Sequence, residues 1–135
     1  MVYDGPMKFE LLDKVLERSE DRIVTVKNVT AAEEYLQDHF PSFPILPGVM
    51  MLECLVQAAR ALLSSEDSEG DLPWVLGQVK NVRYGNMVQP GEQLVVTVSK
   101  MKASDGEITF KGQGTVNENV AVQGRFVMRR LIKAL

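Results

Sequence analysis

Two side chains in this sequence have the types and the spacing that proton transfer requires, His39 and Glu53. His39 is the only histidine and lies in residues 39–48, which hold three of the six prolines. A free imidazole titrates near pH 6.5, so a histidine side chain can accept or release a proton at cellular pH. Glu53 is the one carboxylate within the most apolar segment, residues 45–63. Desolvation in such a segment favours the neutral carboxylic acid, which can donate a proton.

The backbone N–H of Gly48 is a third group that can take part in chemistry, because a helix is expected to start there, with Pro47 in its first turn. The first N–H groups of a helix have no acceptor within the helix and lie at the positive end of its dipole. Glycine also lets a ligand approach the backbone closely. We expect Gly48, with Val49 beside it, to bind and polarise a carbonyl group.

Each of these residues also has an ordinary structural explanation. A lone histidine in a loop is usually structural or exposed, and a lone acid in an apolar helix usually lies at an interface or pairs with a base such as Arg60. Pro-Gly before a helix is mostly a start signal. Cys54 points about 100° away from Glu53 around the helix, and we interpret it as a packing residue. One histidine and one cysteine do not make a typical zinc site, so we expect no metal.

The element that positions the acid is a long helix ending near Leu63. Glu53, Gln57 and Arg60 are spaced four and three residues apart, so they form one stripe along it. The segment approaches membrane-spanning length, but these polar residues favour a helix buried within a folded domain.

Strands are expected around this helix. Residues 9–17 and 22–29 predict a hairpin, with a helix as the alternative for 9–17. Thr30 is placed to cap a short helix over 31–36. Four further strands are expected over 73–84, 93–101, 107–116 and 120–131, with turns at Asp105-Gly106 and at 117–119. In the strand 93–101 the apolar residues Leu94, Val96, Val98 and Met101 are expected on or near one side. This order predicts one α+β domain, residues 1–135, in which a curved antiparallel sheet wraps a central helix. Its open sheet edges favour pairing with a second copy.

The composition excludes several classes of partner. Lys and Arg number 15 against 18 for Asp and Glu, a net charge of −3. This balance argues against broad nucleic-acid binding and against a polybasic membrane anchor. One cysteine fits a reducing compartment, and residues 1–7 do not resemble a secretory leader, so we expect a cytoplasmic protein.

The motif His39-Phe-Pro-x-x-Pro-x-x-Pro-Gly48, followed by Glu53 and Gln57, resembles the FabZ type of (3R)-hydroxyacyl-[acyl carrier protein] dehydratase. The family also has 14 residues between its histidine and its glutamate, the spacing found here. Residues 27–30, 82–83 and 90–94 are similar as well, and the resemblance spans about residues 8–127.

The resemblance implies the hotdog fold and the loss of water from a 3-hydroxyacyl thioester to give a trans-2-enoyl thioester, in fatty-acid or related lipid synthesis. The acyl chain would be carried on the phosphopantetheine of acyl carrier protein, or on CoA, with no other cofactor. His39 would move the C2 proton, Glu53 would assist departure of the 3-hydroxyl, Gly48 would bind the thioester carbonyl and Gln57 would orient the acid. Each site would combine His39 of one subunit with Glu53 of the other in a homodimer, and three dimers could form a hexamer.

Two positions depart from the family pattern, since Ser42 and Phe43 stand where the family usually has glycine and histidine. They affect the expected substrate rather than the acid–base pair. Tyr84 falls in a region that gates the site in relatives. Two rival functions remain open, a hotdog acyl-thioesterase and a non-catalytic acyl-binding subunit. Arg83, Arg129, Arg130 and Lys133 are candidates for docking an acidic carrier protein, although a solvated strand end is the more ordinary explanation for them.

Overall fold

The computed structural model describes residues 11–30, 46–64 and 72–131. Along these residues the elements are β1 (Lys14–Arg18), β2 (Arg22–Asn28), α2 (Gly48–Ser64), β3 (Trp74–Tyr84), β4 (Gln93–Ser104), β5 (Glu107–Val116) and β6 (Asn119–Arg130). The helix and the strands from β2 onward begin and end within about three residues of the ranges that the sequence predicts. The short helix expected over 31–36 lies outside the described residues.

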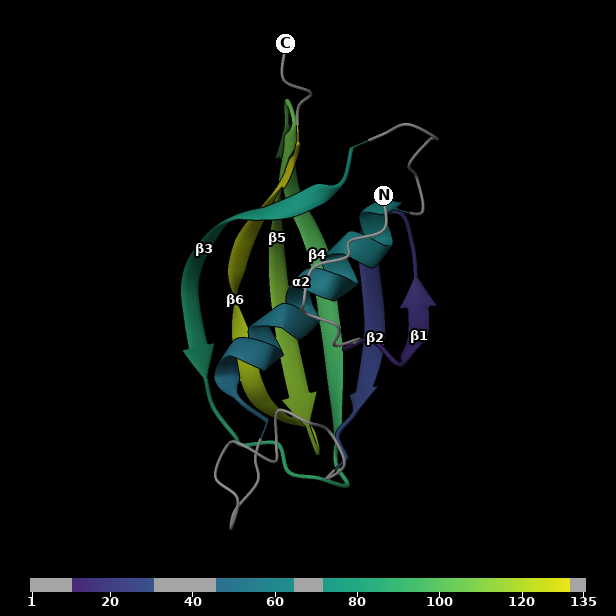
Figure 1. The fold of residues 1–135 in the computed structure, drawn as a ribbon, viewed down its shortest axis with the longest axis vertical. Coiled ribbons are helices and arrows are strands. Elements are labelled where there is room, and N and C mark those ends of the chain that lie inside the picture. Colours follow the sequence, from purple (N-terminus) through teal and green to yellow (C-terminus); the bar gives the residue numbers. More distant parts are fainter. Residues whose placement is uncertain (1–10, 31–45, 65–71, 132–135) are drawn as a thin grey trace.

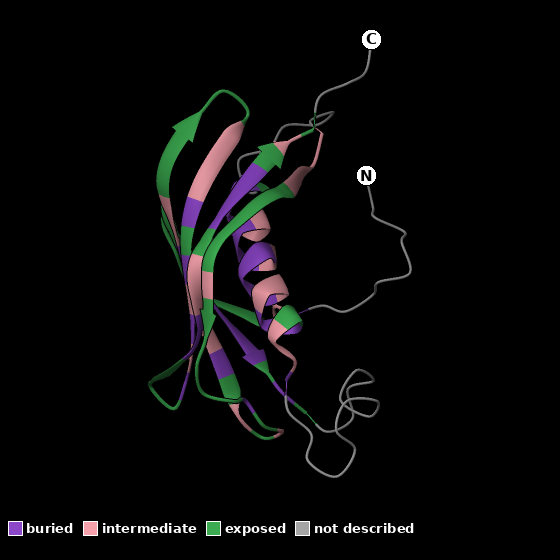
Figure 2. Cartoon of the chain, turned by 90° about the vertical axis from the view of Figure 1, so that its left-hand side faces the viewer, coloured by how far each residue is buried: buried purple, intermediate pink, exposed green. Residues whose placement is uncertain are grey.

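The strands form one antiparallel sheet in the order β1-β2-β4-β5-β6-β3, and α2 crosses one face of it (Figure 1). The chain leaves the sheet after β2, passes through α2 and returns as β3 on the far edge, beside β6. Seen from the side, the sheet curves around the helix (Figure 2). The expected α+β hotdog arrangement, a curved antiparallel sheet around one central helix, is therefore confirmed.

The core lies between α2 and the concave face of the sheet. Leu94, Val96 and Val98 of β4 are fully buried, as strand alternation requires when one face is covered. The buried residues of α2 recur on one side of the helix, toward the sheet (Figure 2): Met50, Met51, Cys54, Leu55, Val56, Ala58, Ala59, Leu62 and Leu63. Burial of a single large apolar side chain contributes roughly 1.5–3 kcal/mol, so this interface stabilises the position of the helix.

Glycines on β5 and β6 make room for large side chains on the concave face. Gly112 and Gly124 lie opposite each other across the two strands. A Cβ atom at Gly112 would lie 3.1 Å from Leu55 Cδ1, and one at Gly124 would lie 2.9 Å from Val82 Cγ2. The missing side chains leave room for Leu55 of α2 at Gly112 and for Val82 of the neighbouring strand β3 at Gly124.

The first strand is shorter than the range 9–17 that the sequence predicts. Leu11 is buried but lies outside the sheet ladder, and β1 starts only after Asp13. The Asp13 carboxylate accepts a hydrogen bond from the Asn28 N–H (2.6 Å) and lies 3.6 Å from Lys27 Nζ. The Asp13 N–H also donates to the Val26 carbonyl of β2 (2.9 Å), so side-chain and backbone bonds together fix the chain just before β1.

Met101 is a second departure from the predicted pattern. It was expected with the apolar residues of β4, but it is 47% exposed. The register between β4 and β5 shifts between Lys100 and Lys102, so Met101 has no partner on β5. Met101 lies three residues after the buried Val98, so strand alternation turns it to the opposite face of the sheet.

Among the residues that the structure describes, we find no helix with both the length and the apolarity needed to cross a membrane.

Candidate active site

The N-terminus of α2 is built on Pro47. The Pro47 carbonyl accepts hydrogen bonds from Met50 N (3.0 Å) and Met51 N (3.1 Å), so Pro47 precedes the helix rather than lying in its first turn. The Leu46 N–H bonds to the Val88 carbonyl (2.8 Å), which ties the start of the helix to the loop after β3. This anchor fixes where the first helical N–H groups lie.

Two backbone donors are left over at this end of the helix. Within the described part of the chain, neither the Gly48 N–H nor the Val49 N–H has a hydrogen-bond acceptor. Val49 is also 68% exposed. An open pair of N–H groups at the positive end of a helix dipole suits a carbonyl oxygen or an anion.

Tyr84 lies against this helix start. A Cβ atom at Gly48 would lie 3.0 Å from Tyr84 Cε1 and 3.2 Å from Cζ, so the ring occupies the side on which other residues carry a side chain. Tyr84 is the last residue of β3 and remains 51% exposed. The lack of a side chain at Gly48 therefore admits this ring, a reason that the sequence did not reveal.

Glu53 is held by the next polar residue on its face of the helix. Gln57 Nε2 donates a hydrogen bond to Glu53 Oε2 (3.2 Å), while Gln57 Oε1 accepts one from the Leu11 N–H (2.8 Å). Because the Leu11 N–H can only donate, it fixes which end of the amide faces the acid. The Glu53 side chain is half-buried in this chain.

The Leu11 backbone is the part of this arrangement that the sequence did not indicate. A backbone N–H has no residue-type signal, and this one lies 46 residues from Gln57 along the chain. Only the three-dimensional path of the segment before β1 brings it to the helix.

Arg60 lies on the same helix stripe as Glu53, but its hydrogen bond goes to a different partner. Its Nε donates to the Trp74 carbonyl (3.2 Å) at the start of β3. Trp74 in turn lies under the Arg130 guanidinium, 4.5 Å from the ring centroid. The polar stripe therefore divides into a first part around Glu53 and a second part that anchors β3.

Two of the predicted carrier-docking residues make contacts within the chain. Arg129 pairs with Glu107 (2.8 Å), and Arg130 also donates to the Leu72 carbonyl (2.6 Å). Arg83 is exposed on β3, whereas Lys133 lies outside the described residues.

His39, Ser42 and Phe43 also lie outside the described residues. The pairing of His39 with Glu53 thus stays a prediction. Over the ranges that are described, no group of three or more His, Cys, Asp and Glu residues is arranged to hold a metal ion.

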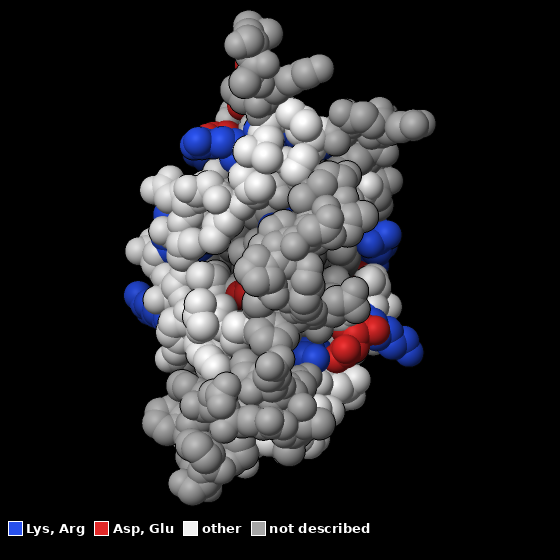
Figure 3. All heavy atoms as spheres, viewed as in Figure 1, with Lys and Arg blue, Asp and Glu red and all other residues white. Residues whose placement is uncertain are grey.

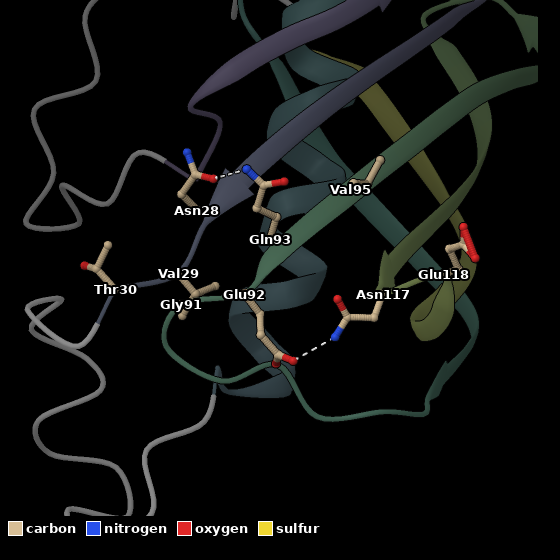
Figure 4. A pocket seen from close by; sticks show the side chains of 9 residues that line it. All are labelled: Asn28, Val29, Thr30, Gly91, Glu92, Gln93, Val95, Asn117 and Glu118. Atoms are coloured by element: carbon tan, nitrogen blue, oxygen red, sulfur yellow. Dashed lines mark hydrogen bonds between the residues drawn. The ribbon is translucent and has the colours of Figure 1, made fainter.

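A pocket of about 630 Å³ opens at the end of β2 and the start of β4, next to the turn between β5 and β6 (Figure 4). Its lining is mostly polar, and hydrogen bonds join Gln93 to Asn28 (2.8 Å) and Asn117 to Glu92 (2.9 Å). In Figure 4 the strands pass in front of α2, so the pocket faces away from the helix. None of the predicted site residues lines it, and we do not assign the acid–base chemistry to it.

Comparison with known proteins connects this arrangement to one family. The family model described as ApeI-like, ApeI dehydratase, matches residues 15–125. The 3-hydroxyacyl-[acyl-carrier-protein] dehydratase FabZ of Lactococcus lactis subsp. lactis is 39% identical over 117 residues, covering 86% of this chain and 81% of the relative. The FabZ of Streptococcus sanguinis is 39% identical over 115 residues, covering 84% of this chain and 81% of the relative.

Solved structures share the fold at lower identity. The dehydratase heterocomplex ApeI:P from Xenorhabdus doucetiae superposes with a TM-score of 0.69 at 20% identity, covering 91% of this chain and 100% of that one. The fluoroacetyl-CoA-specific thioesterase FlK superposes at 0.71 with 11% identity, covering 85% and 88%. At these identities the likeness shows the fold alone, because one fold hosts several chemistries. On the family match and the FabZ identities together, the chain belongs to the hotdog family of FabZ-type and ApeI-like dehydratases.

Proposed function

We propose that this protein removes water from a 3-hydroxyacyl thioester to give a trans-2-enoyl thioester, as a hydro-lyase of fatty-acid or related lipid synthesis. The observation that carries the proposal is the 39% identity to FabZ over 86% of the chain. The geometry at the start of α2 is consistent with it, because an acid and two open N–H groups lie within the first three turns of one helix.

In the proposed reaction His39 takes the proton from C2 of the acyl chain. The electrons of that C–H bond form the C2–C3 double bond, and the C3–O bond breaks. Glu53, as the neutral acid, gives its proton to the departing hydroxyl, so that water leaves. The proton held by His39 then returns to Glu53 through solvent or product, which restores both groups. Each proton transfer by a positioned side chain of this kind typically raises the rate by about 10²- to 10⁴-fold.

Gln57 acts as a positioning residue in this scheme. Its amide N–H bonds to one oxygen of Glu53, which leaves the other oxygen for the substrate hydroxyl. The Leu11 N–H holds the amide in that orientation from behind.

The thioester carbonyl binds at the open N–H groups of Gly48 and Val49. Negative charge grows on this oxygen when the C2 proton leaves, and preorganised N–H donors stabilise such charge by about 3–4 kcal/mol. Tyr84, packed on Gly48, forms one side of the entry to this position. We propose that Tyr84, together with Phe43 and Ser42, selects the acyl chain.

The active assembly is a homodimer in this proposal, and three dimers can form a hexamer. β3 is an edge strand of the sheet, and apolar side chains near it are exposed: Leu76, Val79, Tyr84 and Met87. An open edge with exposed apolar residues favours pairing with another chain. The second subunit would bring its His39 to Glu53.

The substrate would arrive on the phosphopantetheine of acyl carrier protein, or on CoA, and the reaction uses no other cofactor. We place the protein in the cytoplasm, which suits a single, buried cysteine.

The test is hydration of a trans-2-enoyl thioester, followed as loss of conjugated absorbance. We expect wild-type protein to consume the substrate, and His39→Ala to slow it by about 10²-fold or more. Equal rates for the variant and the wild type would refute the proposed role of His39.

Two rival functions give different signals in the same assay. A thioesterase releases free thiol, which a trapping dye detects. Its enoyl thioester absorbance falls only as fast as the thiol appears. A non-catalytic acyl-binding subunit binds the thioester and turns over no acyl length. Either pattern would overturn the dehydratase assignment.

A further inference from the structure

The convex face of the sheet, away from α2, carries a line of basic side chains on neighbouring strands. Lys80 of β3 lies opposite Arg125 of β6, and Arg125 lies opposite Lys111 of β5. We call these three residues the basic row. All three are exposed. The residues beside Arg125 and Lys111 that face the core, Phe126 and Gly112, are buried, so alternation turns the basic row outward.

The basic row is not neutralised within the described part of the chain. None of its members forms an ion pair with a described acid; the ion pairs found there involve Arg22, Lys27 and Arg129. The same-face neighbours two residues along β5 and β6 are uncharged: Thr109, Gln113, Gln123 and Val127. Like charges directly opposite each other on adjacent strands destabilise a sheet. The fold therefore gains nothing from three cations in line.

The surroundings of the basic row favour a protein partner over a lipid surface or a nucleic acid. A lipid surface is bound through exposed apolar side chains beside the cations, but on this face Val127 is buried and the other neighbours are polar. Nucleic-acid binding needs a broader basic surface than the basic row with Arg83, which lies opposite Gln123, on a chain of net charge −3. The described residues of the opposite face are mostly uncharged, with their cations at the margins (Figure 3).

The spacing of the basic row indicates the shape of that partner. Neighbouring strands lie about 4.8 Å apart, so the three cations follow one another at that interval across the strands. Acidic residues three or four positions apart on a helix are separated by about 4.5–6 Å along its axis. A helix lying across the strands can therefore place one carboxylate against each cation.

We propose that the basic row is a docking surface for an acidic helix of another protein, separate from the site that handles the acyl group. The helix would carry Asp or Glu at positions i, i+3 or i+4, and i+7. Its attachment leaves the face with Glu53 accessible, because the two lie on opposite sides of the sheet.

The test uses two labelled, alanine-rich peptides of about 18 residues, long enough for helix formation. One has three glutamates at i, i+4 and i+7; the other has the same composition with the glutamates spread around the helix. By fluorescence anisotropy at low salt, we expect the first to bind roughly tenfold more tightly, with the difference lost at high salt.

Arg125→Glu is the informative variant, and Lys14→Glu on β1 is its matched control, with the same change in net charge. We expect Arg125→Glu to bind both peptides equally weakly and Lys14→Glu to bind as wild type. Arg125→Glu also places an acid between two lysines, so its melting temperature should rise by about a few degrees. That readout shows that it is folded.

Equal binding of the two peptides by wild-type protein, or equal loss in the two variants, would overturn the proposal. So would tighter binding to phosphatidylserine vesicles or to a single-stranded oligonucleotide than to the first peptide. Enoyl thioester hydration by Arg125→Glu should match wild type, and this arm separates the docking surface from the proposed enzyme activity.

Discussion

The two ends of α2 differ in how their polar groups are satisfied. At the C-terminal end, Arg18 Nη2 donates to the Ala61 carbonyl (3.2 Å), and Arg60 links the helix to β3. At the N-terminal end, Gly48 and Val49 keep N–H groups without acceptors among the described residues. The C-terminal contacts stabilise the fold, whereas the open donors add no stability and are available to a ligand.

The difference teaches where mutations should separate activity from stability. Groups that the fold satisfies internally should cost stability when removed. Groups that the fold holds in place without a hydrogen-bond partner should cost activity, rather than stability, when they are removed. Glu53 and Arg60 test this directly, since they lie two turns apart on one side of one helix.

The largest expected effect is that of Glu53→Gln on activity. The variant keeps the size of the side chain but cannot supply the proton, so enoyl thioester hydration should slow by about 10²- to 10⁴-fold. Its melting temperature should stay close to that of wild type.

Arg60→Gln is the matched control at the other end. It should keep the hydration rate and lose about 1 kcal/mol through the missing bond to the Trp74 carbonyl. If Glu53→Gln unfolds the protein and Arg60→Gln inactivates it, the contrast between the two ends is wrong.

Gln57→Leu should lower both activity and stability, because Gln57 bonds to Glu53 and to the Leu11 N–H. It leaves the part-buried Leu11 N–H without its acceptor, which costs about 1–3 kcal/mol in denaturant unfolding. It also frees the Glu53 carboxyl, so kcat should fall by about tenfold while KM changes little. Gln57→Glu supplies an acceptor for Leu11 and should recover stability but not kcat. An unchanged kcat in both variants would contradict the positioning role.

The smallest expected effect is that of Gly48→Ala. Alanine favours the helix by about 0.5–1 kcal/mol, but its Cβ would lie 3.0 Å from the Tyr84 ring and displace it. We expect a modest rise in KM, roughly threefold, which is about 0.6 kcal/mol. Adding Tyr84→Ala should make the two changes non-additive, as for residues in contact. Additive effects would show that the ring and the helix start do not cooperate.

Most of the fold could be predicted because its signals are local. The alternation in β4 from Leu94 to Val98 and the turn at Asp105-Gly106 depend on residues next to one another. The start of β1 could not be predicted, because Leu11 is fixed by Gln57, far along the chain. Met101 was misplaced for a different reason, since it lies an odd number of residues from the buried Val98 and alternation turns it outward.

The candidate site was predictable to the extent that side chains carry it. The spacing of Glu53 and Gln57 by four residues indicates one helix face, and the structure joins them by a hydrogen bond. The contact between Gly48 and Tyr84 brings together two elements that are not adjacent in the chain, and no sequence pattern encodes it.

The hydrogen bond from the Leu11 N–H to Gln57 has a practical consequence for spectroscopy. This amide proton is two hydrogen bonds away from the proposed catalytic acid, yet it belongs to a residue with no part in the chemistry. Its chemical shift in a ¹⁵N-labelled sample should change when a ligand hydrogen-bonds to Glu53. Its exchange with solvent should slow when the bond from the Leu11 N–H to Gln57 is strengthened. A single backbone resonance can thus report the state of the acid without any change to the catalytic groups.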